Sequence, residues 1–194
     1  MITTSITQSN LQTALRAFLL NTIGSGWQVI ESQDNRVAMP LGNFVAMTSL
    51  NMPMLSTSKA TWHDPGTNPG IEHNLTSSQW RCQLDFYGQG AQDAALIVSR
   101  LVRTEYACDQ FNFGLTLDGS WLFDGSEILN GITVDMQPLY AEDPRNTTML
   151  NAEQQFEERW TFDFIAQFNP IVDTPLDFAD TLTPTLVEVE ITYP

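Results

Sequence analysis

The segment from Glu157 to Asn169 limits the possible folds most strongly, because its side chains alternate between apolar and polar over the whole length of a strand. The apolar face consists of Trp160, Phe162, Phe164, Ala166 and Phe168. A shift of one residue in pairing would turn four aromatic rings into water, so the register of this strand should be fixed. Each buried aromatic side chain contributes roughly 1.5–3 kcal/mol, so this face is expected to anchor the core.

The segment from Arg81 to Glu105 predicts a strand, a glycine turn and a helix. Cys82, Leu84 and Phe86 alternate with Arg81, Gln83, Asp85 and Tyr87, which indicates a half-buried strand. Gly88 and Gly90 interrupt it, and apolar residues then recur at helical spacing. We predict that Tyr106–Phe113 either continues this helix or forms a second one.

Further elements are predicted on both sides of this unit. Gln8–Thr22 reads as an amphipathic helix with Ser9 or Asn10 as its N-cap and Gly24 as its stop. A long hairpin is expected from Ser58–Trp62 and Glu72–Tyr87, and strands are expected at Asn43–Leu50, Ile132–Met136 and Leu186–Ile191. Gly114–Asn130 is expected to be a loop, and Pro138–Asn151 polar and irregular.

These elements predict an α+β fold: a mostly antiparallel sheet with a long hairpin, flanked by two or three helices. The length of 194 residues suits one domain over residues 1–194, with 173–194 as an extended C-terminal arm. Cys82 and Cys108 are read as free thiols in a reducing compartment. The first ten residues show no secretory signal pattern, and the apolar runs are too short to span a membrane.

Negative charge is concentrated in the C-terminal part of the chain. Residues 118–194 hold 15 acidic and 2 basic residues, within a total net charge of −15. Such a chain repels phosphate and has no basic surface with which to grip nucleic acid. Two interpretations remain open: a solvated acidic surface that aids solubility, or a surface past which DNA slides without sticking.

Candidate chemistry is sparse. His63, Asp64, Glu72 and His73 cluster around the predicted hairpin loop and are ligand types that suit zinc, but their spacing matches no metal motif. Gly88-Gln89-Gly90 lacks the third glycine of a dinucleotide-binding turn, since Asp93 occupies that position. We therefore predict no catalytic residue, no metal site and no cofactor.

Two segments resemble the neck or tail-terminator proteins of tailed bacteriophages. They are Asn35–Leu50 (NRVAMPLGNFVAMTSL) and Gln83–Arg103, in which the matching residues are Asn35, Arg36, Pro40, Gln83, Asp85, Tyr87 and Gly88. The resemblance implies a hexameric ring at the head–tail junction, which caps the tail tube or joins it to the connector. It also implies connector, tail-tube and sheath proteins as partners, DNA passing through the lumen without specific binding, and a location in the virion after synthesis in the host cytoplasm.

A ring of identical subunits requires one side of the subunit to complement the other. We predict subunit contacts through Gln83, Asp85 and Tyr87, and through Val187, Val189 and Ile191 of the last predicted strand. Two other functions stay open on the sequence. One is a tail-completion or baseplate adaptor protein, and the other is a small metal- or ligand-binding enzyme that uses His63, Asp64, Glu72 and His73.

Overall fold

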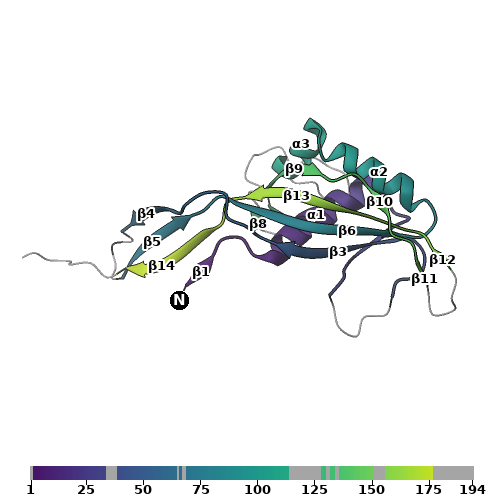
Figure 1. Cartoon of the computed structure of the whole chain (residues 1–194). Helices are drawn as coiled ribbons and strands as arrows, with labels where there is room; N and C mark the ends of the chain where they lie inside the picture. The colour runs from purple at the N-terminus through teal and green to yellow at the C-terminus, as the bar shows by residue number, and fades with distance from the viewer. Residues whose placement is uncertain are drawn as a thin grey trace, which may run out of the picture.

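One long two-stranded ribbon runs through two sheets and organises the fold (Figure 1). The computed structural model describes residues 2–33, 39–64, 66, 69–113, 128–129, 132–133, 136–150 and 156–176. One side of the ribbon is β5 (Gly70–Leu75) followed by β6 (Ser78–Tyr87), and the other is β13 (Arg159–Phe168) followed by β14 (Ile171–Leu176). The antiparallel register does not change between the sheets: Phe168 pairs with Ser78 and Ile171 with Leu75.

The ribbon extends from a body into an arm. The body sheet has the order β10-β13-β6-β3-β2, with β9 also pairing with β13, and adds β2 (Gln28–Glu31), β3 (Phe44–Asn51), β9 (Met136–Ala141) and β10 (Arg145–Asn146). The arm sheet has the order β1-β14-β5-β4, with β1 (Thr3–Thr4) and β4 (Lys59–His63) at its edges. Two small ladders pair β7 (Ile128–Leu129) with β8 (Ile132–Thr133) and β11 (Met149–Leu150) with β12 (Phe156–Glu157). The described strands pair antiparallel except for β2 with β3, so the predicted α+β class with a mostly antiparallel sheet is confirmed.

In the described ranges three helices belong to the body: α1 (Gln8–Ile23), α2 (Ala91–Leu101) and α3 (Glu105–Phe113). The prediction of Ser9 or Asn10 as the N-cap of α1 is wrong. Thr7 is the cap, and Asn10 is its reciprocal partner in a capping box, where its side chain accepts a bond from the Thr7 backbone N–H at 2.8 Å. Gly24 ends the helix as predicted, with φ of 81°. Of the two readings of Tyr106–Phe113, the second short helix is correct.

The core lies between the helices and one face of the body sheet. The predicted apolar faces of β6 and β13 form the sheet side of the core, where Phe86, Phe162, Phe164 and also Trp80 are fully buried. Leu11, Leu15 and Leu19 of α1 and Val98 of α2 pack against this face. The aromatic rings meet one another, with Phe86 stacked on Phe162 at 5.6 Å between centroids. The alternating patterns in the sequence therefore identified the core correctly.

Two predicted boundaries are wrong. The second arm of the predicted hairpin, Glu72–Tyr87, divides at Thr76 and Ser77 into an arm strand and a body strand. Pro138–Asn151 is not irregular, because β9, β10 and β11 lie in it. Pro138 hid this, since a proline cannot donate to a ladder. It is accommodated on an outer strand, opposite Ala166 and beside a register shift in β13.

Other predictions fall partly or wholly outside the described residues. Of Gly114–Asn130, only Ile128 and Leu129 are described, and they form β7 and not a loop. Of Ile132–Met136, the first two residues form β8 and the last begins β9. Leu186–Ile191 lies outside the described residues, whereas the first part of the predicted C-terminal arm, Asp173–Leu176, belongs to β14.

Candidate assembly surface

The face of the body sheet opposite the helices carries a network of charged and polar side chains. The side chains of this network come from every second position of β6 and β13, the positions that the sequence pattern predicted to point away from the core. Arg81, Gln83, Asp85 and Tyr87 lie on β6, and Arg159, Thr161 and Asp163 lie on β13. The ribbon register places Arg159 opposite Tyr87, Thr161 opposite Asp85, and Asp163 opposite Gln83. We call these seven residues the polar face.

Asp85 is the acceptor at the centre of the polar face and is 4% exposed. Its Oδ1 pairs with Nη2 of Arg159 at 3.0 Å and also accepts from the Thr161 hydroxyl. Nε2 of Gln83 donates to both carboxylate oxygens, at 2.9 and 3.1 Å. The carboxylate thus holds three neighbouring side chains in place, and the predicted contact residue Asp85 itself is almost fully covered.

A second group of charges lies further along the ribbon. Nη2 of Arg81 is 2.8 Å from Oε1 of Glu142, and its Nε is 3.4 Å from Oδ2 of Asp163. Oδ1 of Asp163 is buried without a hydrogen-bond partner among the described residues. Burial, followed by the charge of Glu142, raises the pKa of Asp163, while Arg81 opposes the rise.

Tyr87 joins the polar face to a groove at the end of the body. Its ring stacks on Phe44 at 4.5 Å between centroids, and the guanidinium carbon of Arg159 lies 5.5 Å from its centre. Burial raises the pKa of Tyr87, and Arg159 partly offsets the rise. The groove has a volume of about 580 Å³ and is lined by Met39, Pro40, Leu41, Gly42, Phe44, Tyr87, Gly88, Gln89, Glu157 and Glu158.

Gly88 is required where β6 leaves this groove. Its φ is 101°, and a Cβ at this position would lie 2.3 Å from Oδ1 of Asn43. Nδ2 of Asn43 donates to the Gln89 carbonyl at 3.0 Å, which fixes the turn before α2. The glycine turn found in the sequence therefore serves close backbone packing.

The arm carries His63, Asp64, Glu72 and His73, the residues of the alternative metal- or ligand-binding site. The His63 and His73 rings are 6.0 Å apart between centroids, but Nδ1 of His73 lies 2.6 Å from Oδ1 of Asp173, across the ribbon. Glu72 is contacted by the Thr174 hydroxyl at 3.4 Å. Within the described ranges, no three His, Cys, Asp or Glu side chains come together as metal ligands.

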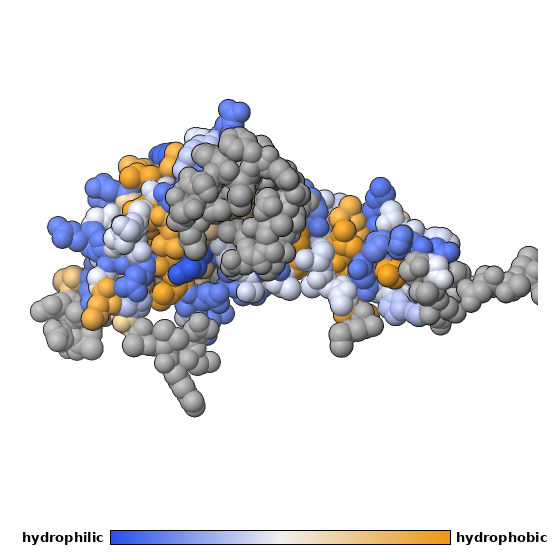
Figure 2. Space-filling model, turned by 180° about the vertical axis from the view of Figure 1, so that it is seen from behind, coloured by the Kyte–Doolittle hydropathy of each residue, from blue (hydrophilic) through white to orange (hydrophobic). Residues whose placement is uncertain are grey.

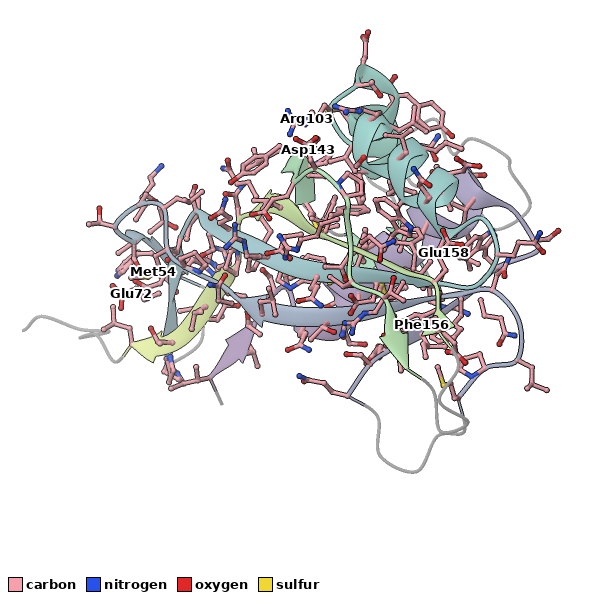
Figure 3. All side chains as sticks on the ribbon, turned by 45° about the vertical axis from the view of Figure 1, so that its right-hand side comes forward. Met54, Glu72, Arg103, Asp143, Phe156 and Glu158 are labelled. Atoms are coloured by element: carbon pink, nitrogen blue, oxygen red, sulfur yellow. The ribbon has the colours of Figure 1, made fainter. Side chains whose placement is uncertain are left out.

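Exposed apolar side chains occur at both ends of the molecule (Figures 2 and 3). On the arm side, Trp62 is 58% and Met54 71% exposed, and at the opposite end Leu41 is 92% and Phe156 81% exposed. Figure 3 shows Met54 at the arm and Phe156 at the far end of the body. Of the predicted contact residues, Val187, Val189 and Ile191 lie outside the described residues.

Sequence reasoning missed several residues of these surfaces. It did not find the pairing of Arg159 with Asp85 or the groove formed by Phe44 and Tyr87. The only signal in the sequence was a polar residue at every second position of two strands. Which strand lies opposite which is decided by pairing between segments about seventy residues apart, and no local pattern contains that information.

The fold and surfaces define an α+β module with a projecting arm and a polar sheet face. A family model described as "Phage neck terminator protein" matches residues 9–192, almost the whole chain, so the chain belongs to the phage neck terminator family. The protein is therefore a structural component of the phage neck and tail region, located in the virion with other head–tail proteins as its partners. A search of curated proteins finds no match.

In the described part of the chain, no helix has both the length and the apolar character needed to cross a membrane.

Cys82 is fully buried and Cys108 partly buried, both as free thiols, and burial strongly raises the pKa of Cys82. The Cys82 thiol is therefore protonated at neutral pH and serves in packing.

Proposed function

We propose that the protein forms a hexameric ring at the junction between the phage neck and tail. The ring terminates the tail tube or joins it to the connector, and DNA passes through the lumen of the ring. Its partners are further copies of itself, connector proteins, tail-tube proteins and, in a contractile tail, sheath proteins. The observation that carries this proposal is the family match over residues 9–192.

The shape of the subunit supports a head-to-tail ring. Body and arm extend in opposite directions along the ribbon, so the two ends of the subunit present different surfaces. A closed ring of identical subunits requires such heterologous contacts, in which one surface binds a different surface on its neighbour. The exposed apolar residues at both ends are suited to this kind of contact.

The charge of the chain supports a lumen that does not bind DNA. The net charge of −15 and the presence of a single lysine, Lys59, leave no extended basic surface for phosphate. Acidic side chains around a central hole would repel the DNA backbone and let it slide.

Within the ring, we propose Gln83 and Tyr87 as contacts on the polar face. Both are partly exposed, and Asp85, which lies between them along β6, fixes the side chain of Gln83. Asp85 thereby contributes to the contact by holding its neighbours in position. Val187, Val189 and Ile191 complete the proposed contact set.

Negative-stain imaging tests the ring directly. The purified protein, alone and mixed with tail tubes of the phage that encodes it, should form rings with a central hole. A protein that stays monomeric and never joins tails would refute the proposal.

A matched pair of variants tests the polar face. Gln83→Lys keeps a donor for Asp85 but changes the charge at the proposed contact, and should reduce the fraction of subunits in rings several-fold. Gln79→Lys makes the same change on the same face of β6, four residues toward the arm, and should assemble like the wild type. Equal assembly by the two variants would contradict the assigned contact.

A further inference from the structure

The arm ends in an exposed edge strand. Among the described residues, β4 is the last strand of the arm sheet, and all five of its residues are exposed. An exposed strand edge is a template for pairing with another strand. Lys59, at its first position, is its only residue with a permanent charge, so Ala60–His63 form a neutral pairing edge.

The two faces of β4 differ in character. Ala60 and Trp62 lie on one face, while Lys59, Thr61 and His63 lie on the other, because side chains alternate along a strand. Trp62 is 58% exposed. A strand that pairs with β4 would therefore meet Trp62 on one face and a polar face with one lysine on the other.

The chain continues well beyond the arm. β14 ends at Leu176, which pairs with Gly70 at the tip of the arm, where β5 begins (Figure 1). The residues that follow, 177–194, can span roughly 60 Å when extended. The six residues of β14 span roughly 20 Å, so the tail is long enough to extend well past its own arm.

The sequence of this tail complements β4. In Leu186–Ile191, Val187, Val189 and Ile191 alternate with Glu188 and Glu190. One face of such a strand is aliphatic and branched, and the other carries two carboxylates. A β-branched residue opposite Trp62 and a carboxylate opposite Lys59 are two of the kinds of cross-strand pair that stabilise sheets.

We propose that Leu186–Ile191 of one subunit adds as a strand to the edge of β4 in the neighbouring subunit. Val187, Val189 and Ile191 pack on the face of Ala60 and Trp62, and Glu188 and Glu190 pair with Lys59. This inference rests on the proposed ring and names one of its contacts. It is a form of strand addition, in which backbone bonds give affinity and alternate side chains give specificity.

Disulfide trapping tests the contact and its orientation. In a Cys108→Ser background, Thr61→Cys is combined in one chain with Glu188→Cys or with Glu190→Cys, which share the charged face. Mild oxidation should give a ladder of covalent multimers on a non-reducing gel. Thr61→Cys with Val189→Cys is the matched control, because Val189 points to the opposite face and should give no ladder.

A charge exchange tests the same contact without cysteines. Lys59→Glu should weaken subunit association about ten-fold, since it places like charges opposite each other. Adding Glu188→Lys and Glu190→Lys to this variant should restore assembly. Asp177→Lys with Asp180→Lys makes the same charge change upstream of the predicted strand and should not restore it.

The outcomes separate the contact from the ring. A bond formed only within single chains would show that the tail returns to its own β4, and would overturn the inference. Rings without a ladder and without charge rescue would overturn the contact and leave the ring proposal standing. A wild-type protein that neither forms rings nor joins tails would overturn both.

Discussion

Replacing Asp85 with Asn removes the carboxylate to which three other side chains of the polar face bond. The Asp85 carboxylate pairs with Arg159 at 3.0 Å and accepts from Gln83 and Thr161. An asparagine keeps one acceptor oxygen but points an NH₂ group at the donors that remain. Arg159 would then lose the counter-charge of Asp85.

The size of the effect follows from burial. Removing one partner of a buried ion pair typically costs about 3–5 kcal/mol, because the other charge remains desolvated. The Arg159 side chain is 27% exposed and can recover some hydration, so we expect a loss of about 2–4 kcal/mol in the free energy of unfolding. This is a large fraction of the ordinary stability of a domain, about 5–15 kcal/mol.

Urea unfolding followed by circular dichroism measures this loss. The midpoint should fall while the slope m stays unchanged, since the folded and unfolded surfaces are nearly the same. Asp143→Asn is the matched control, because Asp143 pairs with Arg100 at 3.7 Å with side chains 81% and 64% exposed. It should change stability by less than about 0.5 kcal/mol. Equal losses in the two variants would refute the reasoning from burial.

Three further predictions concern stability and can be read by the same unfolding assay. Phe164→Ala should lower the free energy of unfolding by about 3–5 kcal/mol, because the ring is fully buried against Trp80. Phe156→Ala is the control and should lower it little, since Phe156 is 81% exposed. Similar losses in the two variants would contradict the assigned core. Gly88→Ala should cost about 1–3 kcal/mol from its positive φ and the close approach of a Cβ to its neighbour, and an unchanged midpoint would contradict this. Asp163→Asn should be more stable than the wild type at pH 7, because the pKa of this carboxyl is raised in the folded state and its ionisation therefore costs stability. The stability advantage of the variant should shrink as the pH falls through the raised pKa toward the ordinary value of about 3.9. An advantage that grows on acidification would show that the sign is wrong.

Local patterns in the sequence identified most of the elements correctly. The alternation in β6 and β13 predicted both strands and their buried faces, and the apolar spacing predicted α1 and α2. These predictions succeeded because each depends on residues within a few positions of one another. The N-cap of α1 and the strand at Pro138 were missed because the local pattern does not decide either of them. The first depends on which of several neighbouring polar residues closes the capping box, and the second on a distant strand that accepts a proline on its outer edge.

The sequence by itself therefore determined which residues face the core, the acidic character of the chain and its resemblance to phage terminator proteins. The tertiary structure decided that β5 and β6 form one ribbon with β14 and β13, that this ribbon divides into body and arm, and that Asp85 pairs with Arg159. The physical reason is the separation along the chain. A period-two pattern fixes the direction of a side chain, but its neighbour across the sheet depends on the register between distant strands, and that register is set only when the whole apolar face is buried at once.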